Sequence, residues 1–146
     1  MRRYDDSVTV IAMVPSTSRQ DASVAHGIAE RVLIVDDEPA FRDLARTLLA
    51  ARGYDVVAEA SCAASALDAV ARHHPQAVLM DVYLGHDDGV EVCELLTRLR
   101  PGLAVLLVSA TELDHPERIT RCGARGFVPK YRLHKIDFKE FFGVEH

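Results

Sequence analysis

Five polar side chains come directly after apolar runs in this sequence, and their types are those that bind a metal ion or a phosphoryl group. Asp36 and Asp37 follow the first such run, and Asp81 follows another. Ser109 and Lys130 come at the ends of two later runs. Taken singly, a carboxylate often caps a helix and a lysine often only solvates a loop. Their repeated placement after apolar runs favours one shared site.

The chemistry of such a site follows from its charges. Three neighbouring carboxylates repel one another unless a cation lies among them, and hard oxygen ligands suit Mg²⁺. An aspartate can also attack phosphorus and form an aspartyl phosphate. Lys130 and the hydroxyl of Ser109 would then neutralise charge on the phosphoryl oxygens. The residue types therefore predict Mg²⁺-assisted phosphoryl transfer to a carboxylate.

These side chains meet only if the apolar runs lie side by side in a parallel sheet. Five short runs have the composition of buried strands, at residues 31–35, 56–58, 77–80, 103–108 and 126–128. Helical patterns separate them along the chain. Unbroken apolar strands that alternate with helices are typical of a parallel sheet covered on both faces. We therefore predict a doubly wound α/β fold of five strands and five helices.

Helical periodicity places apolar residues on one face of each predicted helix. In the helix after Pro39 this stripe comprises Phe41, Leu44, Ala45, Leu48 and Leu49. In the helix after Gly89 it comprises Val92, Leu95, Leu96 and Leu99. A weak fourth helix is predicted at residues 116–121. The last helix would bury Ile136, Phe138, Phe141 and Phe142.

Composition limits the classes of function. The 146 residues carry a net charge of −5, so direct nucleic-acid binding is not expected. No apolar run approaches the ~20 residues that cross a bilayer. Three widely spaced cysteines fit reduced thiols in a cytoplasmic protein. Residues 1–30 are predicted to be a flexible extension, in which residues 8–14 could add to a sheet edge. Residues 31–143 then form one domain, with no output domain.

Four motifs together resemble the receiver domain of bacterial two-component response regulators. In chain order they are LIVDDE, LMDVYLGHDDG, LLVSAT and CGARGFVPK, and the resemblance runs from about Arg31 to Phe142. The resemblance implies a flavodoxin-like fold with strand order 2-1-3-4-5. It also implies that Asp81 is the phosphoacceptor and one of the Mg²⁺ ligands. Asp37 would bind Mg²⁺ directly, Asp36 would assist, and Tyr83 would offer its backbone carbonyl.

The resemblance assigns three further residues to phosphoryl binding and switching. Ser109 would be the switch hydroxyl, Lys130 would pair with the phosphoryl group, and Phe127 would be the switch aromatic. Asp81, Ser109 and Lys130 would be the catalytic side chains. The sequence departs from the family pattern at Gly85, where a proline is usual, and we expect a more flexible loop there. No departure removes a catalytic group.

The resulting hypothesis is a stand-alone phosphoprotein that acts in a phosphorelay. A sensor histidine kinase or a phosphotransfer protein would supply the phosphoryl group, and the only reactions would be self-phosphorylation and self-dephosphorylation. A downstream protein or a second copy would read the face of the fourth and last helices, which includes Arg118 and Arg121. The alternative is an adaptor or dimerisation module that uses the same face without phosphate. A Mg²⁺-dependent phosphatase would need a substrate pocket that this chain is too short to supply.

Overall fold

The computed structural model describes residues 11–12 and 29–143. The predicted flexible extension over residues 1–30 therefore lies almost entirely outside the described residues. Of its apolar segment 8–14, two residues form strand β1 (Ile11–Ala12), which pairs antiparallel with residues 126 and 127 of the last strand. The predicted addition to a sheet edge is thus confirmed for these two residues.

Five parallel strands form the centre of the molecule, as predicted. They are β2 (Arg31–Val35), β3 (Asp55–Ala60), β4 (Ala77–Asp81), β7 (Ala104–Ser109) and β8 (Gly126–Pro129). The sheet order is β1-β8-β7-β4-β2-β3. Without β1, and read from β3 to β8 with the parallel strands counted in chain order, this is the predicted order 2-1-3-4-5. The prediction of a doubly wound sheet is therefore confirmed. The sheet has six strands rather than five because β1 extends the edge at β8.

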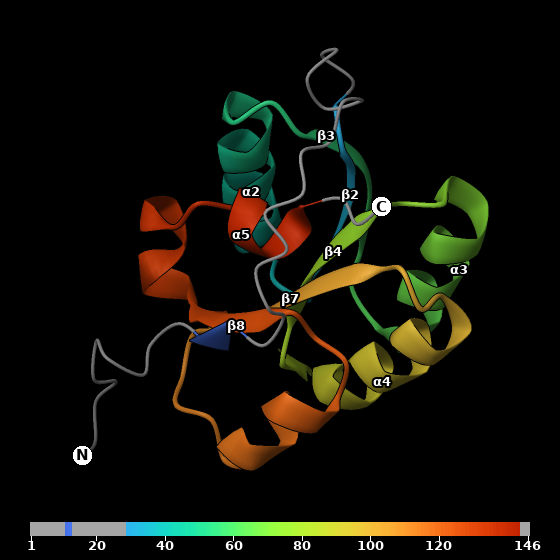
Figure 1. Ribbon diagram of the computed structural model, residues 1–146, viewed down its shortest axis with the longest axis vertical. Helices are drawn as coiled ribbons and strands as arrows, with labels where there is room; N and C mark the ends of the chain where they lie inside the picture. The colour runs from blue at the N-terminus through green and yellow to red at the C-terminus, as the bar shows by residue number, and fades with distance from the viewer. Residues whose placement is uncertain (1–10, 13–28, 144–146) are drawn as a thin grey trace.

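Helices cover both faces of the sheet. Figure 1 shows α2 (Pro39–Ala51) and α5 (Lys139–Phe142) on one side, with α3 (Ala63–His73) and α4 (Gly89–Leu99) on the other. Alternate residues of β2 enter the two layers: Leu33 joins the core under α3 and α4, whereas Ile34 joins the core under α2 and α5. No helix in the described part of the chain is long and apolar enough to cross a bilayer.

The segment between β7 and β8 does not form the predicted fourth α-helix. Residues Pro116–Arg121 form the 3₁₀ helix η2, whose only buried residue is Ile119. A second 3₁₀ helix, η3 (Lys130–Lys135), precedes α5, so the predicted last helix is also split. One buried apolar residue anchors too little surface to stabilise a longer helix, because helical stability comes mostly from packing of an apolar face.

Three leucines of the predicted apolar stripes are on the surface. Leu44 of α2 is 61% exposed, and Leu95 and Leu99 of α4 are 37% and 63% exposed. The residues that α2 buries are Phe41, Ala45 and Leu49, and those that α4 buries include Val92, Cys93 and Leu96. The predicted stripes were therefore too wide, because each helix presents only a narrow edge to the sheet. The prediction for the C-terminus is confirmed at Phe138, Phe141 and Phe142, which are buried.

Gly89 allows α4 to begin directly against the strand that ends on Asp81. A Cβ atom at position 89 would lie 1.9 Å from the backbone oxygen of Asp81 and 3.0 Å from the Cα of Val82. The Gly89 N–H donates to the Val82 carbonyl at 2.7 Å. Only glycine permits this approach of two backbones.

We predict that Gly89→Ala lowers the free energy of unfolding by at least about 2 kcal/mol, because the added methyl group must displace backbone. The gain in helix propensity from alanine, up to about 1 kcal/mol, does not offset this. Chemical denaturation measures the effect. Gly102→Ala is the matched control, since a Cβ there meets nothing within 4 Å. Equal stabilities for the two variants would contradict the close approach.

Candidate functional site

The carboxyl ends of the parallel strands bring the predicted site residues to one edge of the sheet. Asp36 follows β2, Asp81 ends β4, Ser109 ends β7 and Lys130 follows β8. Adjacent strands are in register there, with Asp81 opposite Val108. Open α/β sheets bind their ligands at this edge.

A buried ammonium group connects two of the carboxylates. Lys130 Nζ lies 2.7 Å from Asp36 Oδ2 and 3.1 Å from Asp81 Oδ2. Asp36 is fully buried, and the side chain of Lys130 is 12% exposed. Charged groups at this depth are stable only when they are paired, so the three side chains depend on one another.

Asp36, Asp37 and Asp81 form the acidic cluster that the sequence predicts. One carboxylate oxygen from each lies within 4.8 Å of the other two, and Asp37 is exposed to solvent. An all-oxygen, partly hydrated site of this kind suits Mg²⁺, which retains several water ligands. The residues present therefore fit the ion. The N–H of Tyr83 donates to Asp81 Oδ1 at 3.1 Å, and the ligand role of the Tyr83 carbonyl stays a prediction.

Burial and the charge of Asp36 raise the pKa of Asp81 to about 6, against the opposing effects of the Tyr83 N–H and Lys130. Burial lowers the pKa of Lys130, but its hydrogen bond to Asp36 and the charge of Asp81 outweigh burial and raise it overall. Lys130 therefore stays an ammonium ion. Asp81 changes charge in a range close to neutral pH.

The position of Asp36 is fixed by contacts that the sequence did not suggest. Its Oδ1 accepts from the Glu38 N–H at 2.9 Å, and its carbonyl accepts from Arg42 Nη1 at 2.7 Å. Arg42 Nε in turn lies 3.0 Å from Glu59 Oε1. Arg42 lies in the polar part of the α2 pattern, where an arginine is expected to be solvated. Nothing in the local sequence therefore indicated that it contacts Asp36.

Ser109 reaches the predicted edge, but its hydroxyl is engaged within its own loop. Ser109 Oγ donates to the carbonyl of Thr111 at 2.8 Å and accepts from the Thr111 N–H at 3.1 Å. Phe127, the predicted switch aromatic, is 1% exposed and packs in the core under α3 and α4. Its role as a switch stays a prediction.

The loop after Asp81 contacts two neighbouring segments, the loop after Ser109 and the 3₁₀ helix η2. Strands β5 (Tyr83–Leu84) and β6 (Asp87–Asp88) form a hairpin. The hydroxyl of Tyr83 accepts from the Asp114 N–H at 2.9 Å, which ties the loop after Ser109 to this hairpin. Asp88 caps α4 and pairs with Arg118 of η2 at 2.8 Å. Arg118, predicted to lie on a partner-binding face, is thus already ion-paired.

Gly85 shapes the same hairpin. Its φ of +67° is in the left-handed region, which glycine adopts readily and proline cannot. A Cβ at this position would lie 3.3 Å from Asp37 Oδ2. The departure from proline therefore suits the turn beside the acidic cluster. The predicted flexibility of this loop stays a prediction.

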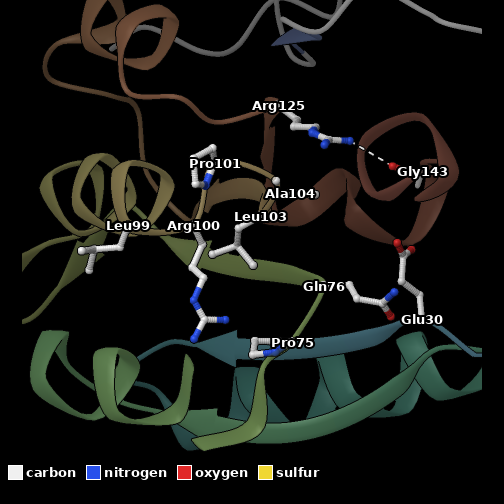
Figure 2. Close-up of a pocket in the computed structure, with 11 residues that line it drawn as sticks. Glu30, Pro75, Gln76, Leu99, Arg100, Pro101, Leu103, Ala104, Arg125 and Gly143 are labelled. Atoms are coloured by element: carbon white, nitrogen blue, oxygen red, sulfur yellow. Dashed lines mark hydrogen bonds between the residues drawn. The ribbon is translucent and has the colours of Figure 1, made fainter. Parts of the chain in front are cut away.

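A cavity of about 440 Å³ lies at the opposite, amino end of the sheet. Figure 2 shows Pro75, Arg100 and Leu103 among the residues that line it, and Arg125 donating to the carbonyl of Gly143. None of the predicted site residues lines this cavity. The chemistry suggested by the sequence is therefore confined to the carboxyl edge.

Comparisons with known proteins agree with the fold. The family model described as the response regulator receiver domain matches residues 32–136. The chain is 36% identical over 102 residues to response regulator MprA of Mycobacterium sp. strain KMS, covering 68% of this chain and 44% of MprA. It is 33% identical over 119 residues to transcriptional regulatory protein PdtaR of Mycobacterium tuberculosis, covering 81% of this chain and 56% of PdtaR.

A solved structure has the same fold. The chain is similar to a CheY-like response regulator receiver domain protein from Methanospirillum hungatei, with a TM-score of 0.64 and 27% identity. This match covers 75% of this chain and 85% of that one. The chain spans about half the length of the curated relatives that it matches.

The raised pKa of Asp81 predicts a pH-dependent stability. A carboxyl group with a pKa of 3.8 when unfolded and about 6 when folded favours the folded state below about pH 4. This contribution is lost as the pH rises through about 6. The free energy of unfolding of Asp81→Asn minus that of the wild type should therefore rise by on the order of 1 to 3 kcal/mol from about pH 4 to pH 7, whatever constant offset the loss of the ion pair adds.

Chemical denaturation in the presence of a chelator measures this difference at each pH. Asp43→Asn is the control for loss of an exposed carboxylate on α2. A stability difference between wild type and Asp81→Asn that is constant with pH would show that Asp81 does not titrate in this range.

Proposed function

Because this chain belongs to the family of response regulator receiver domains, we propose that Asp81 accepts a phosphoryl group from a sensor histidine kinase or a phosphotransfer protein. The observation that carries the proposal is the contact of Lys130 with both Asp81 and Asp36 beside the exposed Asp37. At the carboxyl edge of the sheet, this contact brings together a carboxylate suited to accept the phosphoryl group, a cation for the phosphoryl oxygens and further oxygen ligands for a metal ion.

The transfer needs Asp81 in its ionised form. One of its oxygens attacks phosphorus, the bond from phosphorus to the donor nitrogen breaks, and the electron pair of that bond stays on the donor. The pKa of about 6 leaves most of Asp81 ionised at neutral pH. Lys130 then lies 3.1 Å from an acceptor oxygen and balances the charge that arrives.

Asp36, Asp37 and Asp81 would hold Mg²⁺, with the Tyr83 carbonyl as a further ligand. When bound, the ion offsets repulsion among the carboxylates and neutralises charge on the phosphoryl oxygens. The protein is proposed to act only on its own phosphoryl group, through self-phosphorylation and self-dephosphorylation.

The output is proposed to be a protein–protein contact, made with a downstream protein or a second copy of this chain. The contacts of Ser109 and Tyr83 support this proposal, since both hydroxyls bind the loop at residues 111–114. If Ser109 turns to the phosphoryl group, its two bonds to Thr111 must break. That change would reach η2, which follows in the chain, and bias the surface between two states.

We predict that acetyl phosphate with Mg²⁺ adds one phosphoryl group per chain, and that Asp81→Asn abolishes the addition. Intact-protein mass spectrometry measures it. Asp114→Asn is the control, because Asp114 lies on the loop after Ser109, where its N–H contacts Tyr83, and its carboxylate is outside the acidic cluster. Equal labelling of wild type and Asp81→Asn would overturn the assignment of the acceptor.

Beryllofluoride, which mimics an aspartyl phosphate, should release the Thr111 N–H from Ser109. We expect faster amide hydrogen exchange at Thr111 in the wild type with Mg²⁺ and beryllofluoride, and no change in Asp81→Asn. Exchange resolved by residue measures this. Binding of beryllofluoride without any change at residues 109–121 would favour the phosphate-independent adaptor instead.

A further inference from the structure

The ring of Phe41 faces the ammonium group of Lys130. The distance from Lys130 Nζ to the ring centroid is 4.1 Å. A cation within about 6 Å of the face of an aromatic ring is attracted by the negative potential of that face. Phe41 is 7% exposed, so the contact is shielded from water. The sequence marks this residue only as part of the core of α2.

The ring is a third neighbour of the ammonium group, beside the two carboxylates. An ammonium group has three N–H donors, and Asp36 and Asp81 lie at 2.7 and 3.1 Å from Nζ. With the Lys130 side chain only 12% exposed, little room is left for water. The ring therefore supplies a further favourable neighbour of this buried charge.

Lysine needs such a neighbour because four flexible carbon–carbon bonds carry its charge. Asp36 and Phe41 come from the same short stretch, the end of β2 and the first turn of α2. That stretch therefore contacts the ammonium group with both a carboxylate and a ring. An aliphatic residue at position 41 would fill the same space without attracting the charge.

We propose that Phe41 is a positioning residue whose ring face holds the ammonium group of Lys130 against Asp36 and Asp81. This places the charge where a phosphoryl group on Asp81 needs it. The consequence for phosphorylation rests on the proposed function of Asp81. The contact between the Phe41 ring and the ammonium group of Lys130 does not depend on that proposed function.

Fluorinated phenylalanines at position 41 test the proposal in the full chain. Each fluorine withdraws electron density from the ring face and changes the size of the ring little. The rate of phosphorylation by acetyl phosphate at saturating Mg²⁺ should fall stepwise with the number of fluorines, to a total of roughly three- to tenfold. The affinity for beryllofluoride should fall in parallel. The rate for Phe41→Leu should fall by a similar factor.

The same fluorinated residues at Phe142 are the matched control, since that ring is also buried but stacks on Phe138. Substitution there should leave the rate unchanged. If fluorines at position 41 alter the rate no more than at position 142, and Phe41→Leu matches the wild type, Phe41 only fills the core and the proposal is overturned.

The resonances of the Lys130 Hε protons separate this inference from the proposed function. A ring face 4.1 Å from Nζ shifts the neighbouring Hε protons upfield, and Phe41→Leu should abolish the shift. If the wild type accepts no phosphoryl group, the proposed function fails, and this shift alone decides the contact. An Hε shift that Phe41→Leu leaves unchanged overturns the positioning role.

Discussion

The contact of one buried ammonium group with two buried carboxylates is the constraint on which the rest of this structure depends. Lys130 lies 2.7 Å from Asp36 and 3.1 Å from Asp81, and no solvent reaches Asp36. Removing one partner of a buried ion pair typically costs roughly 3 to 5 kcal/mol, because the other charge stays behind unpaired. The strand ends must therefore bring all three side chains together, and neighbouring segments must hold them there.

The loop after Asp81 links that charge cluster to the surrounding segments. Asp87 accepts from the first N–H of α3 at 2.8 Å, and Asp88 caps α4 and pairs with Arg118 of η2. Tyr83 binds the loop that follows Ser109. Because each contact joins the loop after Asp81 to a different element, the proposed phosphoryl charge on Asp81 would act on several of them at once. These contacts support the proposal that the surface near η2 reports the state of Asp81.

Much of the fold and most of the site residues could be predicted because their signals are local. Apolar runs such as residues 77–80 are too short for helices and too apolar for exposed strands, so they indicate buried parallel strands. A polar residue at the end of such a run must lie at the carboxyl edge. Asp36, Asp81 and Lys130 were therefore assigned correctly to one edge without knowledge of any contact.

What the sequence determined by itself was the parallel sheet and the residue types at its carboxyl edge, and the family resemblance supplied the strand order. The tertiary structure decided how those side chains contact one another. The pairing of Lys130 with Asp36, the contact of its ammonium group with Phe41 and the bond from Asp114 to Tyr83 join residues far apart in the chain. Likewise, only packing reveals that Leu44 and Leu99 are exposed. Periodicity is a property of one segment, whereas burial and pairing depend on which other segments arrive beside it.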